Sequence, residues 1–372
     1  MAVPKGTSIG IDLSNPVRVV AFSKASSQVV STFTAKTPFD PGSKPKLKEL
    51  ASEIKAFCKS LRARLPGTAG LPMSACLLFT VAVPKLRKKE FQKAIQFEIE
   101  RLVPGGSDSM RVVVREWPKG IPLPPSVKVP EGTTLHLVVA ANIQAVLAAE
   151  YLMKAAGIRV SGVEMPANPA SRASWWLWEQ LPSAKLDPIP RNDQGKTASG
   201  SDSNTPVSGA YMPWVTHGNG ALSSSEPEDL ALLPLGDAEH SQDDAHDALP
   251  GANLDISLVA SASEAIMYLS YGACPWLMRE IPLDPDNPFV NGQILAGEIT
   301  RSARFARTAS KGRIDGRVTV FGASDRVSFL ADFLHEQTGL PTQLWGRPVV
   351  DSDPEYGVAI GLALSSEGRA ES

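Results

Sequence analysis

The sequence predicts an α/β fold in two halves that are separated by a long polar insert. Strand-like and helix-like segments alternate from Ser8 to about residue 180, and they alternate again from residue 254 onward. Between them, residues 181–253 consist mainly of Ser, Pro, Gly, Asp and Asn. Alternating strands and helices of this length are typical of α/β folds. The insert offers too little apolar surface to offset its ordering entropy, so we expect it to be disordered.

The first half begins with "SIGIDLSNPVRVVAF", which indicates two strands joined by a turn, with Asp12 at the end of the first. Further on, apolar residues recur at helical spacing from Phe91 to Leu102, and Pro104 stops this helix. The helix "IQAVLAAEYLMKAAG" ends at Gly157, a favourable C-cap residue. The other predicted elements are a strand at Val29–Thr34, a helix at about Leu47–Leu65, a strand at Ala75–Val83, and the strand-like runs "MRVVVREW", "TLHLVVAA" and "IRVSGVEM".

The second half opens with a strand meander, "DISLVASASEAIMYLSYG" followed by "PWLMREIPL". A helix is predicted at about Gln293–Ala309. The remaining elements are the strand "GRVTVFGA", the helix "RVSFLADFLHEQTG", the strand "PTQLWG" and the closing helix "EYGVAIGLALSS". No repeat of the length found in solenoid proteins is evident.

Composition and charge restrict the class of protein. The chain has 372 residues, is 43% hydrophobic and carries a net charge of −2, which suits two domains or one bilobed domain. The insert holds 11 acidic and 3 basic side chains, a net charge of −8, and the remainder is therefore mildly basic at +6. Cys58, Cys76 and Cys274 fit neither a disulfide framework nor a metal-ligand spacing. With no signal-peptide pattern and no long apolar run, we expect a cytoplasmic protein.

The order of motifs resembles the actin-like ATPase superfamily and, within it, the PilM family of type IV pilus assembly proteins. "GIDLSNPVRVV" lies where that family has its first phosphate hairpin, and "VPKLRKKEFQKAIQFEIERLVP" where its small inserted subdomain opens. "YLMKAAGIRVSGVEMPANPASRA", "VTVFGASDRVSFLADFLHEQTGLPTQLW" and "YGVAIGLAL" are similar to its later segments. The similarity covers nearly the whole chain apart from the insert.

This resemblance implies an actin-like fold of two α/β lobes. We expect the first lobe at residues 1–180, with an inserted subdomain at about 84–160, and the second lobe at 254–372. The insert at 181–253 interrupts the family pattern.

The first phosphate hairpin departs from the family pattern. In that family the turn offers backbone N–H groups to nucleotide phosphates, and an Asp helps to hold the water shell of the metal ion. Here Asp12 is present, but Ser14 replaces a glycine, Asn15 follows it, and Pro16 has no N–H to donate. Two interpretations stay open: a weak or vestigial nucleotide turn, or a plain hairpin that Asp12 caps.

The other two phosphate loops are also altered. The second should carry Asp-x-Gly, but those positions hold Leu258 and Ala260, or Asp255 and Ser257 if the register is shifted by three residues. In the third, the expected Gly-Gly turn is Gly322-Ala323, followed by Ser324; alanine adopts the required backbone conformation poorly. We therefore expect no catalytic residues, no metal site and no cofactor beyond weakly bound Mg-ATP.

Two charged surfaces and one aromatic cluster are candidate binding features. Lys85, Arg87, Lys88 and Lys89 precede or begin a helix, where the helix dipole disfavours cations, and with Phe91 and Ile95 they are our candidates for partner binding. Arg301, Arg304 and Arg307 form a basic stripe suited to an acidic peptide, an anionic lipid or a nucleotide phosphate. Trp175, Trp176 and Trp178 share one helix as core residues or an interface anchor. For either charged surface, the alternative to a binding role is an ordinary solvated face.

The expected function is that of a PilM-like scaffold beneath the inner-membrane platform of a type IV pilus or type II secretion-like machine. The resemblance implies a PilN-like, membrane-anchored partner whose N-terminal peptide binds near the inserted subdomain, and other pilus platform proteins as further partners. It implies neither nucleic-acid binding nor a membrane contact other than through partners. The alternatives are an active ATPase, FtsA-like or sugar-kinase-like, and a separately encoded GspL-like platform domain.

Overall fold

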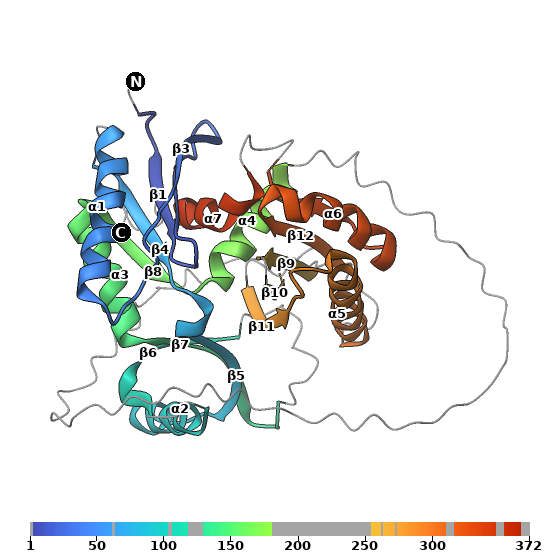
Figure 1. Ribbon diagram of the computed structural model, residues 1–372. Coiled ribbons are helices and arrows are strands. Elements are labelled where there is room, and N and C mark those ends of the chain that lie inside the picture. The colour runs from blue at the N-terminus through green and yellow to red at the C-terminus, as the bar shows by residue number, and fades with distance from the viewer. Residues whose placement is uncertain are drawn as a thin grey trace. The chain divides into compact units, whose positions relative to one another are not determined.

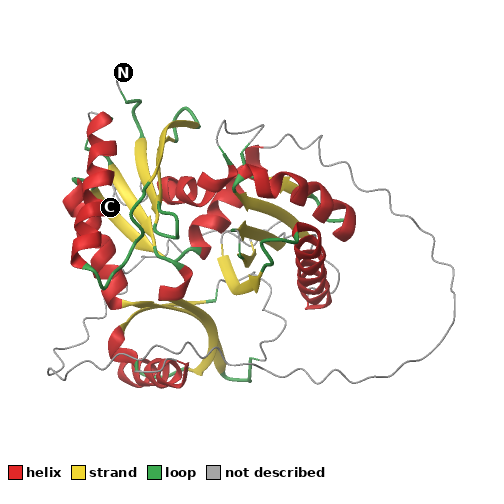
Figure 2. Ribbon diagram, viewed as in Figure 1, coloured by secondary structure: helices red, strands yellow, loops and turns green. Residues whose placement is uncertain are grey.

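The computed structural model describes residues 3–61, 64–102, 106–117, 129–180, 254–261, 263–271, 274–309, 316–346 and 353–365. The insert predicted at 181–253 lies outside the described residues. Within the described part of the chain, the strands form three sheets (Figures 1 and 2).

Sheet 1 has the strand order β3-β2-β1-β4-β8. Its strands are β1 (Thr7–Asp12), β2 (Arg18–Ser23), β3 (Gln28–Thr34), β4 (Pro66–Gly70) and β8 (Arg159–Glu164). The first three form an antiparallel meander, and β4 and β8 continue the sheet in parallel with β1. The predicted hairpin of Ser8–Phe22 is confirmed, with Asp12 opposite Arg18 across the turn.

Sheet 2 repeats this topology in the order β11-β10-β9-β12-β13. Its strands are β9 (Leu254–Ala260), β10 (Glu264–Tyr271), β11 (Cys274–Pro282), β12 (Gly316–Gly322) and β13 (Thr342–Leu344). Again three antiparallel strands are followed by two parallel ones. The two sheets are therefore topological copies of one another.

Helices cover both faces of each of these sheets. α1 (Lys44–Ser60) and α3 (Ile143–Ala156) pack on one face of sheet 1, and α7 (Gly357–Ser365), preceded by the 3-10 turn η4 (Pro354–Tyr356), packs on the other. α5 (Pro288–Ala309) and α6 (Ser324–Thr338) cover one face of sheet 2, and α4 (Ala167–Gln180) covers the other. α4 and α7 pack against each other and so join the two layered units (Figure 1).

Sheet 3 is a smaller unit inserted between β4 and β8. Its order is β5-β7-β6, from β5 (Cys76–Pro84), β6 (Met110–Glu116) and β7 (Thr133–Asn142). One face packs on α2 (Lys88–Leu102), where Ile95 and Ile99 are buried. Two short 3-10 turns, η1 (Met73–Ala75) and η2 (Ser107–Ser109), precede β5 and β6.

Several predicted boundaries are confirmed and two are corrected. Gly157 ends α3 in the left-handed conformation at φ 81°. The helix expected to reach Leu65 ends at Ser60, and the one expected from Gln293 already begins at Pro288. Strand β4, "PGTAG", was not predicted, because its small residues show no hydrophobic alternation. They are small because a Cβ at Gly67 would lie 2.6 Å from the Ile158 side chain.

Candidate functional site

Two backbone N–H groups of the turn after β1 already donate within the protein. Asp12 is 4% exposed, and its Oδ1 accepts a hydrogen bond from the Ser14 N–H at 3.0 Å. The Leu13 N–H donates to the Gly70 carbonyl oxygen at 2.9 Å, and Pro16 has no N–H. A phosphate needs a concave row of free N–H groups. Few remain here, although Asp12, Ser14 and Asn15 do lie together in the turn.

Tyr268 of β10 reaches from sheet 2 into the core beneath sheet 1. It is 1% exposed and belongs to the same buried cluster as Leu13 and Leu71. Burial raises the pKa of Tyr268 well above its ordinary value, and the negative charge of Asp12 is the next cause. Burial likewise raises the pKa of Asp12, against hydrogen bonds from Ser14. These residues fit a magnesium-bound nucleotide poorly, because the carboxylate is buried beside a tyrosine and not open to water.

The turn between β9 and β10 is closed by its own hydrogen bonds. The Ser261 N–H donates to the Glu264 carbonyl oxygen at 2.8 Å, and the Glu264 N–H donates to the Ser261 hydroxyl at 3.2 Å. Leu258 points into the core of sheet 2. The shifted register is wrong in placing Asp255 in this turn: Asp255 lies near the start of β9, five residues or about 16 Å of strand before Ala260.

The glycine at the β12–α6 junction has a packing reason to be there. Gly322 has φ 147°, and a Cβ at this position would lie 2.5 Å from the Ala260 carbonyl oxygen and 2.8 Å from the Val327 side chain. Ala323 is the N-cap of α6 without a side-chain hydrogen bond. Ser324 is the first residue of the helix. The glycine is thus needed for close contact between strands, whether or not a nucleotide binds.

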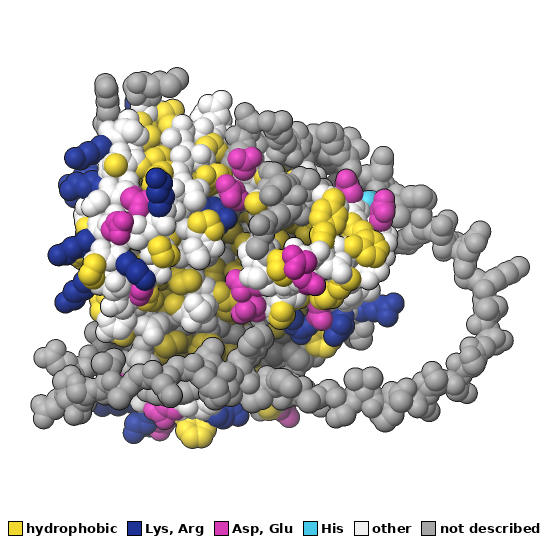
Figure 3. Space-filling model, viewed as in Figure 1, with side chains coloured by type: hydrophobic (Ala, Val, Ile, Leu, Met, Phe, Trp, Pro, Cys, Tyr) yellow, Lys and Arg dark blue, Asp and Glu magenta, His cyan; other side chains and the backbone are white. Residues whose placement is uncertain are grey.

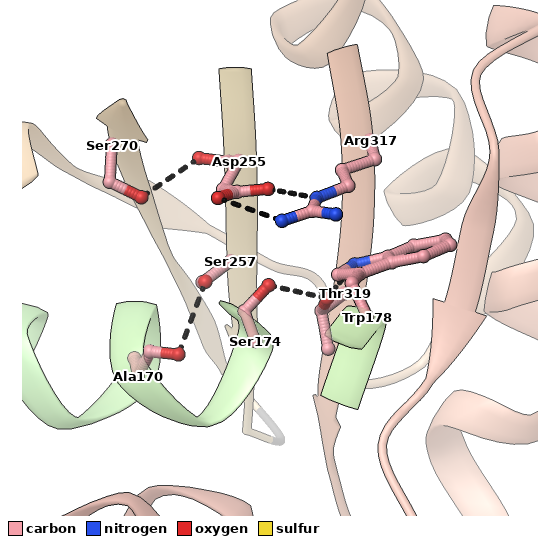
Figure 4. Close-up of polar contacts among 8 residues, drawn as sticks. All are labelled: Ala170, Ser174, Trp178, Asp255, Ser257, Ser270, Arg317 and Thr319. Carbon is pink, nitrogen blue, oxygen red and sulfur yellow. Dashed lines mark hydrogen bonds and ion pairs between the residues drawn. The ribbon is translucent and has the colours of Figure 1, made fainter. Parts of the chain in front are cut away.

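A buried polar network joins α4 to sheet 2 (Figure 4). The hydroxyls of Ser174 and Thr319 are 2.6 Å apart, and the Trp178 indole N–H donates to the Thr319 hydroxyl at 2.9 Å. Arg317 forms an ion pair with Asp255, and its guanidinium carbon lies 5.3 Å from the centre of the Trp178 ring. Trp178 is therefore a packing residue between α4 and β12. Sequence reasoning missed this network, since its members lie far apart in the chain.

The partner-binding candidates on and before α2 differ in exposure. Lys85, Arg87, Lys88 and Lys89 are exposed. Phe91 is half-buried, with its ring centre 4.8 Å from that of His136, and Ile95 is 4% exposed in the core between α2 and sheet 3. The side chain of Ile95 is thus unavailable to a partner. Phe97, which sequence reasoning did not single out, is 64% exposed on the same helix.

Two arginines of the basic stripe line a cavity between α5 and α6. The cavity has a volume of about 560 Å³, and Arg301 and Arg304 form part of its wall. Arg307 belongs to α5, but its side chain lies outside the described part of the structure. Among the described residues, no helix is both long enough and apolar enough to cross a membrane.

No protein-family model and no curated protein sequence matches this chain. Its structure is similar to a chain of a solved "PilM-PilN type IV pilus biogenesis complex", with a TM-score of 0.58 and 18% identity over 97% of this chain and 98% of that one. Weaker similarities are to the ethanolamine utilization protein EutJ from Carboxydothermus hydrogenoformans (TM-score 0.42, 10% identity, 98% and 91% covered) and the cytoplasmic domain of EpsL from Vibrio cholerae (TM-score 0.42, 11% identity, 97% and 96% covered).

The chain therefore has the actin-like ATPase fold, as the sequence predicts. The similarity to a chain of the PilM–PilN complex extends over almost the entire length of both chains.

Proposed function

We propose that the chain is a PilM-like scaffold on the cytoplasmic side of the inner-membrane platform of a type IV pilus or a related secretion machine. The observation that carries this proposal is the fold similarity to a chain of a PilM–PilN complex, which extends over 97% of the present chain. In this role the protein stays at the inner membrane through its partners and acts by binding, not by catalysis.

We place the binding site of a PilN-like partner on the exposed side of α2. The candidate contacts are the four cations at Lys85, Arg87, Lys88 and Lys89 together with Phe97. Phe91 and Ile95 support this surface from below, because they pack against sheet 3. An N-terminal peptide with acidic and apolar side chains would match a helix face that combines exposed cations with an exposed aromatic ring.

The same proposal includes a vestigial nucleotide site. It is supported by the backbone N–H groups of the first turn that already donate hydrogen bonds within the protein. The burial of Tyr268 near Asp12 supports it as well. The surviving Gly322 does not argue for nucleotide binding, because strand packing alone requires it.

The decisive experiment measures binding of the full chain to the N-terminal peptide of a PilN-like protein. We expect Phe97→Asp to weaken binding at least tenfold, since aromatic hot-spot residues contribute about 2 kcal/mol or more and a tenfold change corresponds to about 1.4 kcal/mol. Lys88→Glu with Lys89→Glu should weaken it further at low salt. Phe305→Asp, at a phenylalanine of α5 that is also exposed, is the control. Equal binding by wild type, the α2 variants and the control would place the site elsewhere, and no binding by wild type would reject the scaffold assignment.

A further inference from the structure

The C-terminal part of α5 extends beyond the helix that packs beside it. The rings of Phe289 and Phe333 meet at 5.6 Å, which fixes the alignment of α5 against α6. α5 precedes β12 in the chain and α6 follows it. α6 ends at Thr338, about one and a half turns after Phe333, whereas α5 continues to Ala309.

The cavity of about 560 Å³ lies where α6 ends beside α5. Its polar wall consists of Arg301, Arg304, Thr300 and Gln293 from α5 and Gln337 from α6. Small residues of α5 form the rest of the wall, including Gly297, at which a Cβ would have nothing within 4 Å. Guanidinium, hydroxyl and amide groups are together the donors that hold phosphate oxygens in proteins.

The residues that line this cavity include two arginines and no acidic side chain. Glu298 is the one acidic residue in the sequence of α5, and its carboxylate is shared between Arg279 and Arg301. The Arg301 side chain is still 71% exposed. One carboxylate thus pairs with two guanidinium groups, and Arg304 also lines the cavity.

Exposed apolar side chains accompany the two arginines along α5. Ile294 and Phe305 are each 42% exposed, and Val290 is also exposed. Together with Arg301 they recur at positions 290, 294, 301 and 305, a spacing that places them on one side of the helix. In Figure 3, basic and hydrophobic side chains lie next to each other in the region where Figure 1 draws α5. Basic residues among exposed apolar ones are typical of helices that lie in a membrane interface.

We propose that this cavity binds the phosphate of an anionic phospholipid headgroup and that the exposed side of α5 lies against the membrane surface. Arg301 and Arg304 hold the phosphate oxygens, with Thr300 and the two glutamines as further donors. Phe305 and Ile294 enter the boundary between headgroups and acyl chains. The exposed acids Asp332 and Glu336 on α6 restrict the contact to the α5 side. This site is separate from the partner surface on α2.

Vesicle sedimentation with the full chain tests the proposal without any partner protein, so its result is independent of the proposed scaffold function. We expect binding to vesicles of phosphatidylglycerol and none to vesicles of phosphatidylcholine. Arg304→Gln should weaken the binding about fivefold, and Arg301→Gln with Arg304→Gln about 25-fold, since each basic residue contributes about fivefold at an anionic surface. Lys88→Gln with Lys89→Gln removes the same charge from α2 and should leave vesicle binding unchanged.

Gly297→Leu places an apolar side chain in the cavity without changing the charge, and the open space at this position should let the variant fold. It should abolish the preference for phosphatidylglycerol if the cavity holds the headgroup. A second outcome is that the wild type binds soluble glycerol phosphate but not vesicles, and that Gly297→Leu loses this binding. That result would overturn the lipid as the source of the phosphate. Equal weakening by the α2 control, or no binding to either probe, would overturn the site itself.

Discussion

Asp255 and Arg317 show how one ion pair supports the interior of sheet 2. The Asp255 carboxylate is completely buried and is bound by the Arg317 guanidinium, which also lies over the Trp178 ring. The effect of such a buried pair on stability is largest when only one of its two partners is removed. A buried carboxylate left without its cation loses both its hydrogen bonds and its charge compensation.

Arg317→Met should therefore lower the free energy of unfolding by about 3–5 kcal/mol, measured by urea denaturation. The matched control is Arg101→Met, which breaks an exposed pair with Glu98 and should cost less than about 1 kcal/mol. Asp255→Asn added to Arg317→Met should recover part of the loss, because it removes the buried negative charge. Equal losses for Arg317→Met and Arg101→Met would contradict a structural role for the buried pair.

Asp12 gives a second residue-scale prediction, through the pH dependence of stability. Burial raises the pKa of Asp12 above its ordinary value of 3.8, so ionisation of this group favours the unfolded chain. The resulting loss of stability is complete above the folded-state pKa and vanishes as the pH falls below 3.8. Asp12→Asn keeps an oxygen for the Ser14 N–H and should be more stable than wild type at pH 7, but equally stable near pH 3.

Denaturation curves of Asp12→Asn and wild type at several pH values test this prediction. A less stable Asp12→Asn protein at pH 7 would mean that the carboxylate charge stabilises the fold, as at a site built for a cation. Asp40→Asn serves as the control of opposite sign. The hydrogen bond from Lys46 lowers the pKa of Asp40. The ionised Asp40 carboxylate therefore stabilises the folded chain at neutral pH, and this stabilisation is lost on acidification.

At the scale of elements, α4 is held on sheet 2 by hydrogen bonds as well as by apolar packing. Ser174 and Trp178 both point from α4 to the single hydroxyl of Thr319 in β12 (Figure 4). One side chain of β12 thus satisfies two polar groups of the helix. This contact fixes the rotation of α4 about its axis, since both partners lie one turn apart on the same face.

Thr319→Val should lower the free energy of unfolding by about 2–4 kcal/mol, because it leaves the Ser174 hydroxyl and the Trp178 N–H buried without their partner. Urea denaturation followed by tryptophan fluorescence measures the effect. Thr32→Val, at an exposed position of β3, should change stability by less than about 0.5 kcal/mol. A neutral Thr319→Val variant would show that water or another group replaces the lost hydroxyl.

At the scale of the whole molecule, two sheets with the same strand order are joined by α4 and α7. In this arrangement the β1–β2 and β9–β10 turns and the β12–α6 junction occupy equivalent strand ends of the two sheets. The two turns between strands form hydrogen bonds of their own, and Gly322 at the β12–α6 junction lies close to Ala260 and Val327. The vestigial nucleotide site that we propose would lie at these strand ends.

We expect Mg-ATP to bind with a dissociation constant above about 1 mM. Each lost charge-assisted hydrogen bond to phosphate costs about 1.5–3 kcal/mol, and the first turn lacks at least two free donors. Calorimetry at millimolar ligand measures this, with Asp12→Ala as the comparison. Low-micromolar binding, or hydrolysis that Asp12→Ala abolishes, would contradict the assignment of a vestigial site.

The sequence by itself determined the features that depend on local order. Apolar spacing from Phe91 to Leu102 predicted α2, Gly157 predicted the end of α3, and the alternation of elements predicted an α/β fold. Strand β4 was not predicted, because the small residues of "PGTAG" show no hydrophobic alternation. Their size is set by the side chains that pack against them.

Only the tertiary structure decided the roles of the candidate site residues. Asp255 meets Arg317 across 62 positions of sequence, Trp178 meets Thr319 across 141, and Tyr268 reaches the neighbourhood of Asp12 from the other sheet. Periodicity describes how a segment folds onto one face, but it carries no information on which distant segment covers that face. The charges, the burial and the hydrogen-bond donors of a site arise from such contacts, so only the folded structure determines them.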